Sequence, residues 1–86
     1  MDIKPGDYIC YTNKKELGKV KRIAGSVSVF AWFHTGDTAS CISSNNFTLV
    51  LTDKLAKEMG EKKVVEYLRL ENFSNDYAIE EIVRKS

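Results

Sequence analysis

The sequence has little histidine, proline or cysteine, and no large excess of charge of either sign. His34 is the only histidine, which excludes a metal centre built from several histidines. One proline and five glycines exclude a collagen-like or low-complexity chain. The longest apolar run is the five residues 29–33, far short of the about 20 that span a bilayer as a helix. Thirteen basic against twelve acidic residues leave a net charge of +1, which excludes a surface that is strongly basic or acidic overall.

No apolar signal segment follows the amino terminus, so we expect a cytoplasmic protein that makes no membrane contact. In that compartment Cys10 and Cys41 are expected to be reduced thiols. These cysteines and His34 include no closely spaced pair of metal ligands, so the sequence predicts no metal site and no cofactor.

The length of 86 residues suits one compact domain, and the composition changes at about Thr52. Before that position the chain is rich in β-branched and aromatic residues, whereas after it Lys, Glu, Leu and Met favour helix. The sequence therefore predicts an α+β protein in which residues 1–51 form a β domain. Residues 52–86 are predicted to form a helical segment that shares or adjoins the same core.

Five short strands are predicted in the first part, at residues 7–12, 17–24, 27–34, 38–42 and 47–51. In the third, Val29 and Phe33 lie on one face and Phe30 and Trp32 on the other, so both faces are apolar. A strand in a small antiparallel sheet normally has one solvated face. The face with Phe30 and Trp32 is therefore expected either to bind a partner or to be covered by another part of the chain.

The second part predicts two or three short helices packed against the strands. Thr52 is a capping residue, Leu55, Ala56 and Met59 are expected to point inward, and Gly60 is expected to end the first helix. Further helices are predicted over residues 61–72 and 76–85.

The first part resembles the small SH3-like barrels of the Tudor and KOW type over residues 3–51. The residues that carry the resemblance are KPGDYI at 4–9, GKVKRI at 18–23 and the aromatic segment 29–36 that ends at a glycine. The resemblance implies a five-stranded SH3-like barrel. Such barrels commonly bind peptides, modified side chains or nucleic acid through aromatic residues.

Residues 55–83 faintly resemble a three-helix bundle of the ubiquitin-associated type. The matching residues are Leu55, Met59, Gly60, Leu68, Asn75, Ala78 and Ile79. The position after Met59-Gly60, apolar in that family, is Glu61 here, so the resemblance implies a shape and no ligand site.

No catalytic constellation is present, so the protein is not expected to be an enzyme. Cys41 and His34 are the residue types of a nucleophile and a base, but the sequence identifies no third residue that would orient them for catalysis. The carboxylates are dispersed along the predicted helices, and the glycines are isolated turn residues rather than a phosphate loop.

The leading functional hypothesis is a non-catalytic module that recognises a protein partner, as an adaptor or inhibitor encoded by a phage or mobile element does. Its expected contacts are residue types that dominate interfaces, namely Tyr8, Tyr11, Phe30, Trp32 and His34. An exposed aromatic patch of this kind also makes a homodimer possible.

The alternative hypothesis is nucleic-acid binding. The local basic excess, Lys14, Lys15, Lys19, Lys21 and Arg22, would bind phosphates, and the aromatic residues of the third strand would stack on bases.

Overall fold

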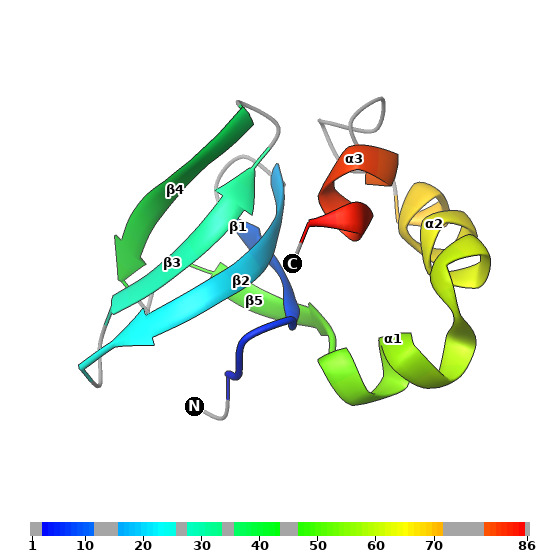
Figure 1. Ribbon diagram of the computed structural model, residues 1–86, viewed down its shortest axis with the longest axis horizontal. Helices are drawn as coiled ribbons and strands as arrows, with labels where there is room; N and C mark the ends of the chain where they lie inside the picture. Colours follow the sequence, from blue (N-terminus) through cyan, green and yellow to red (C-terminus); the bar gives the residue numbers. More distant parts are fainter. Residues whose placement is uncertain are drawn as a thin grey trace.

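A β-sheet stands beside three short helices in the computed structural model (Figure 1), so the protein is α+β. The structure describes residues 3–11, 16–25, 28–33, 36–43, 47–71 and 79–85. The strands are β1 (Tyr8–Tyr11), β2 (Glu16–Ala24), β3 (Ser28–Phe33), β4 (Gly36–Ser43) and β5 (Phe47–Leu51). The helices are α1 (Asp53–Met59), α2 (Glu61–Leu70) and α3 (Ile79–Arg84).

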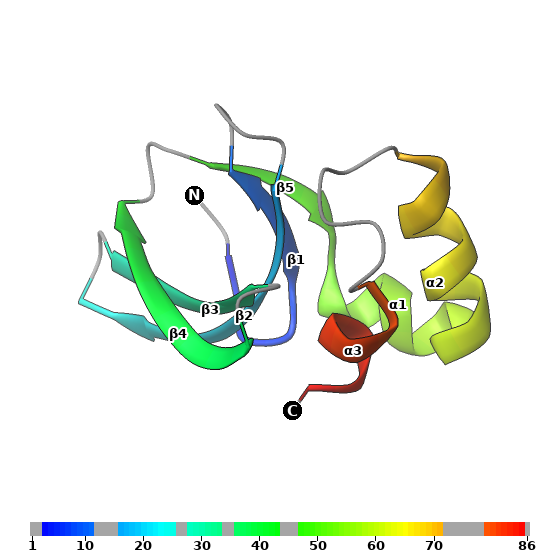
Figure 2. The same cartoon turned by 90° about the horizontal axis from the view of Figure 1, so that it is seen from above.

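The strands pair in the antiparallel order β4-β3-β2-β1-β5, and the sheet is open. In the described part of the chain no hydrogen-bond ladder joins β4 to β5, which are the two edges. The prediction of a closed, five-stranded SH3-like barrel is therefore wrong. The sheet curls without closing, and the described segment that leads into β1, from Ile3, lies inside the curve (Figure 2).

The concave side of the sheet is filled by its own side chains. The cluster there consists of Ile3, Ile9, Val20, Val29, Ala31, Phe33 and Phe47. Since these residues come from the segment before β1 and from four strands, the sheet buries its concave face without a β4–β5 ladder. This packing explains why the strand pattern suggested a barrel although the sheet is open.

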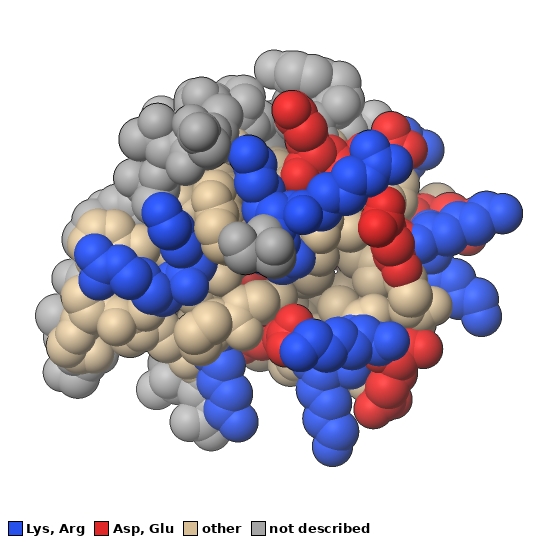
Figure 3. All heavy atoms as spheres, in the orientation of Figure 1, with Lys and Arg blue, Asp and Glu red and all other residues tan. Residues whose placement is uncertain are grey.

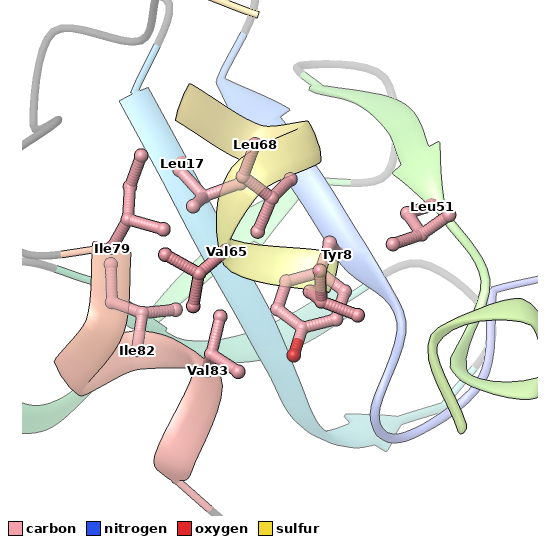
Figure 4. Close-up of a cluster of buried hydrophobic side chains, with 9 residues drawn as sticks. Tyr8, Leu17, Leu51, Val65, Leu68, Ile79, Ile82 and Val83 are labelled. Atoms are coloured by element: carbon pink, nitrogen blue, oxygen red, sulfur yellow. The ribbon is translucent and has the colours of Figure 1, made fainter. Parts of the chain in front are cut away.

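The convex side of β1 and β2 is covered by the helices (Figures 1 and 2). Tyr8 and Leu17 project from the strands into a second cluster (Figure 4). The other buried members are Leu51, Val64, Val65, Leu68, Ile79, Ile82 and Val83. Strands and helices thus share one hydrophobic cluster, and β1 has apolar neighbours on both faces because Tyr8 and Ile9 point in opposite directions.

Helix α1 begins and ends where the sequence suggests. Thr52 Oγ1 accepts a hydrogen bond from the Leu55 backbone N–H at 3.2 Å, and Gly60 ends the helix with φ at 88°. The helix has no fully buried residue, and Leu55 is 50% exposed, so the prediction that Leu55 points inward is wrong. Ala56 and Met59 are half-buried against the shared cluster. None of the helices in the described residues has the length and apolar character needed to span a membrane.

Candidate functional site

A β-bulge places two cations side by side on the convex face. Lys19 pairs with Trp32 and Val20 with Ala31, but the next partner of β3 pairs with Arg22, so Lys21 is an extra residue in β2. Strict alternation would put Arg22 on the same face as buried Val20. The extra residue instead brings Arg22 onto the convex face, next to Lys21.

Both cations lie over aromatic rings of β3. Lys21 Nζ lies 5.7 Å from the centroid of the Trp32 ring, and Arg22 Cζ lies 4.1 Å from that of Phe30. Both distances are within the about 6 Å over which a cation is attracted to a ring face. Lys21 and Arg22 are exposed, Phe30 is half-buried, and Trp32 is only 9% exposed. We name these four residues the basic face.

The charges of the molecule are unevenly distributed. Within the described residues of β2 and β3, Glu16 is the only acidic residue. The helices carry Asp53, Glu58, Glu61, Glu66, Glu80 and Glu81. On the face shown in Figure 3, the strand side carries blue side chains without red ones, whereas blue and red mix over the helices. A net charge near zero therefore conceals an excess of positive charge on β2.

Lys19, on the same convex face, binds backbone carbonyl groups at the end of α3. Its Nζ donates to the Val83 carbonyl at 3.0 Å and to the Lys85 carbonyl at 2.6 Å, and it lies 5.5 Å from the Tyr8 ring centroid. Burial lowers the pKa of this ammonium from its ordinary value. Lys19 thus fastens the end of α3 to β2, and its ammonium is less available to a ligand than those of Lys21 and Arg22.

The predicted aromatic contacts do not form one exposed patch. Tyr8 is 2% exposed, within the cluster under the helices, and Trp32 is largely buried below Lys21. Of the three predicted contacts whose side chains are described, only Phe30 is half-buried. Tyr11 ends β1, but its side chain lies outside the described residues, as does His34.

The predicted basic cluster is divided in a similar way. Lys14 and Lys15 lie outside the described residues, and Lys19 is bound to carbonyl groups. Lys21 and Arg22 are brought together. The sequence analysis named both residues but did not predict that they share a face, because a bulge leaves no periodic signal in the sequence.

Asp7 was not singled out from the sequence, although it is the one buried charged residue among those described, at 3% exposure. Its Oδ2 accepts from the Lys4 backbone N–H at 2.9 Å and its Oδ1 from that of Asp53 at 2.7 Å. The role of Asp7 is to join the turn before β1 to the start of α1. The Pro5-Gly6-Asp7 segment was the available signal, since aspartate favours turns and helix starts.

The described residues include no group of three or more His, Cys, Asp or Glu side chains that could hold a metal ion. Cys10 is half-buried, and the side chain of Cys41 lies outside the described residues.

Comparison with protein-family models, with curated proteins and with solved structures finds no match to this chain. The resemblances to Tudor and KOW barrels and to the ubiquitin-associated bundle therefore stay predictions.

Proposed function

We propose that this protein is a non-catalytic module that binds single-stranded nucleic acid through its phosphates, with Lys21 and Arg22 of the basic face as the contacts. The observation that carries the proposal is the adjacent placement of these two exposed cations over Trp32 and Phe30. Phosphates are bound mainly by lysine and arginine, and arginine offers a planar set of donors that matches two phosphate oxygens.

The aromatic rings support the proposal by fixing the cations rather than by stacking on bases. A ring below a long side chain limits the conformations that the side chain samples, which lowers the entropy lost on binding. Lysine and arginine also bury their methylene groups while keeping the charge in water. Trp32 is too buried to offer a free stacking surface, so its proposed role is to orient Lys21.

A protein partner was the leading hypothesis from the sequence. It depended on an exposed aromatic patch, and two of the five residues of that patch, Tyr8 and Trp32, are buried. The described apolar residues that are well exposed are single residues on different elements, Ile23, Leu49, Leu55 and Leu70. The described surface therefore favours the nucleic-acid hypothesis.

The test is fluorescence anisotropy with a labelled single-stranded oligonucleotide at low and at physiological salt. The informative variant is K21Q/R22Q, and the matched control is K62Q/K63Q, which removes two adjacent exposed cations from α2. We expect K21Q/R22Q to weaken binding at least tenfold and to reduce the slope of log K against log salt by about 1.4, since each phosphate contact contributes about 0.7 for single strands. The control should change affinity by less than about threefold. Equal losses in both variants, or no binding at low salt, would contradict the proposal.

A further inference from the structure

A cleft of about 270 Å³ opens where the convex face of β1 and β2 meets the three helices. Tyr8 and Lys19 line it from the strands, and Ala56, Val64 and Val83 provide apolar surface from the helices. Its volume lies just below the about 300–1,000 Å³ of pockets for drug-sized ligands. The cleft therefore suits a single small ring rather than an extended cofactor.

The hydroxyl of Tyr8 is a buried donor without a partner among the described residues. Tyr8 is 2% exposed, and its hydroxyl points away from Leu17 and Leu68 (Figure 4), while the residue lines the cleft. Buried polar groups nearly always have a hydrogen-bond partner. Burial, with smaller contributions from the Asp53 and Glu61 carboxylates, raises the pKa of Tyr8 to about 12, so at neutral pH the hydroxyl keeps its proton. What the cleft offers a ligand is therefore a hydrogen-bond donor.

The charged groups at the cleft are already paired. Asp53 Oδ2 lies 3.0 Å from Lys57 Nζ, and Glu61 Oε1 accepts from Arg84 Nε at 2.9 Å. Lys19 donates to two carbonyl groups of the chain end. A charged ligand would compete with these pairs, whereas an uncharged ligand leaves them intact. The cleft thus favours an uncharged ring that carries a hydrogen-bond acceptor and an apolar body.

The cleft is next to the basic face on the same side of the sheet. Tyr8 pairs with Lys19 and Lys19 pairs with Trp32, so these three residues form a row across β1, β2 and β3. Neighbouring strands lie about 4.8 Å apart, which places the Tyr8 and Trp32 backbones about 10 Å from each other. A short stretch of single-stranded nucleic acid spans that distance.

We propose that the cleft binds the base of one unpaired nucleotide, with the Tyr8 hydroxyl donating to an acceptor atom of the base. This inference rests on the proposed function, since the phosphates beside that nucleotide would lie on Lys21 and Arg22. A base is uncharged, planar and rich in acceptors, which matches the paired rim charges, the single donor and the apolar wall.

The test measures binding of the base separately from binding of the phosphates. Uridine, which carries no phosphate, is titrated to millimolar concentration into the full chain while backbone amide NMR signals are followed. We expect saturable shifts at Asp53, Ala56, Gly60 and Val64, and a three- to tenfold weaker affinity in Y8F, which removes only the hydroxyl. A56L, which narrows the cleft but keeps the hydroxyl, should also weaken binding. K21Q/R22Q should bind uridine as the unmodified chain does.

Binding of an abasic oligonucleotide, which has phosphates and no bases, is measured in parallel. We expect this binding to depend on Lys21 and Arg22. If the unmodified chain does not bind the abasic oligonucleotide, the proposed function is overturned and the uridine result is unaffected. The cleft proposal is overturned if uridine causes no shifts at those amides. It is also overturned if folded Y8F, checked by its unchanged Trp32 emission, binds uridine as tightly as the unmodified chain.

Discussion

The side chain of Asp7 accepts a hydrogen bond from the backbone N–H of Asp53, with 2.7 Å between Oδ1 and N. Two acidic residues thus meet because one contributes its carboxylate and the other its main chain, at the start of α1. The same carboxylate accepts from the Lys4 N–H. Gly6, at a φ of 93°, lies against this contact, and a Cβ there would clash with the Asp53 side chain. This pair fixes where the helices leave the sheet.

Replacement of Asp7 by alanine is expected to destabilise the protein by about 1–3 kcal/mol, because it leaves two N–H groups without their acceptor. Urea unfolding followed by Trp32 fluorescence measures the change. The matched control is D53N, which keeps the backbone donor, removes the ion pair with Lys57 and should cost less than about 1 kcal/mol. Similar stabilities for D7A and the unmodified chain would show that this contact does not hold α1.

Loss of the Lys19 ammonium should loosen α3. K19M keeps the length of the side chain but cannot donate to Val83 and Lys85, and we expect faster amide hydrogen exchange in α3 with a loss of about 1–3 kcal/mol. Lys85 contributes only its carbonyl to this contact, so K85M is the control and should leave exchange unchanged. Unaltered exchange in K19M would contradict the role given to Lys19.

Gly18 allows the Phe33 ring to lie directly on β2. A Cβ at this position would lie 2.6 Å from Phe33 Cε1, so G18A is expected to destabilise the protein by about 1–3 kcal/mol through overpacking. The double variant G18A/F33L has room for the added methyl group. In a double-mutant cycle the destabilisation of G18A/F33L should therefore be smaller than the sum of those of G18A and F33L. Simple additivity would show that the two side chains are not in contact.

Stability should fall at high pH because of Tyr8. The folded pKa, about 12, is above the ordinary value of 10.0, so the folded protein holds this proton more tightly than the unfolded chain. The contribution is fully present below pH 10 and is lost as pH rises towards 12, by about 2–3 kcal/mol in total. Unfolding measured between pH 9 and 12 should show this decline, and Y8F should lack it. Parallel pH profiles for the two proteins would count against the buried hydroxyl.

Trp32 reports on the basic face, since it is the only tryptophan. With 9% of its surface exposed, its emission should be shifted to short wavelength and resist iodide quenching in the folded state. K21A removes the cation over the ring and is expected to increase quenching moderately. Emission and quenching like those of the unfolded chain would mean that Trp32 is free in solution.

Local signals in the sequence located most elements. Thr52 and Gly60 mark the ends of α1, and the spacing of Val64, Val65 and Leu68 marks the buried face of α2. The two apolar faces of the segment around Trp32 predicted that its second face either binds a partner or is covered by another part of the chain, and Trp32 is indeed 9% exposed beneath Lys21. What failed was closure of the barrel, because closure depends on pairing between edge strands, which no local pattern encodes.

The candidate site was less accessible to prediction. Residue type alone suggested Tyr8 and Trp32 as partner contacts, but their burial depends on where the helices and Lys21 lie. The carbonyl partners of Lys19 come from residues more than sixty positions away. The sequence identified Lys21 and Arg22 as basic neighbours, yet their shared face follows from the bulge.

That single inserted position makes Lys21 a residue of β2 that can be lost without turning the rest of the strand over. Deleting Lys21 would restore strict alternation, with Arg22 still opposite Phe30 on the convex face and Ile23 still opposite Val29. Deleting Val20 would instead place Lys21 opposite Ala31 and towards the concave apolar cluster, where an ammonium has no counter-ion among the described members.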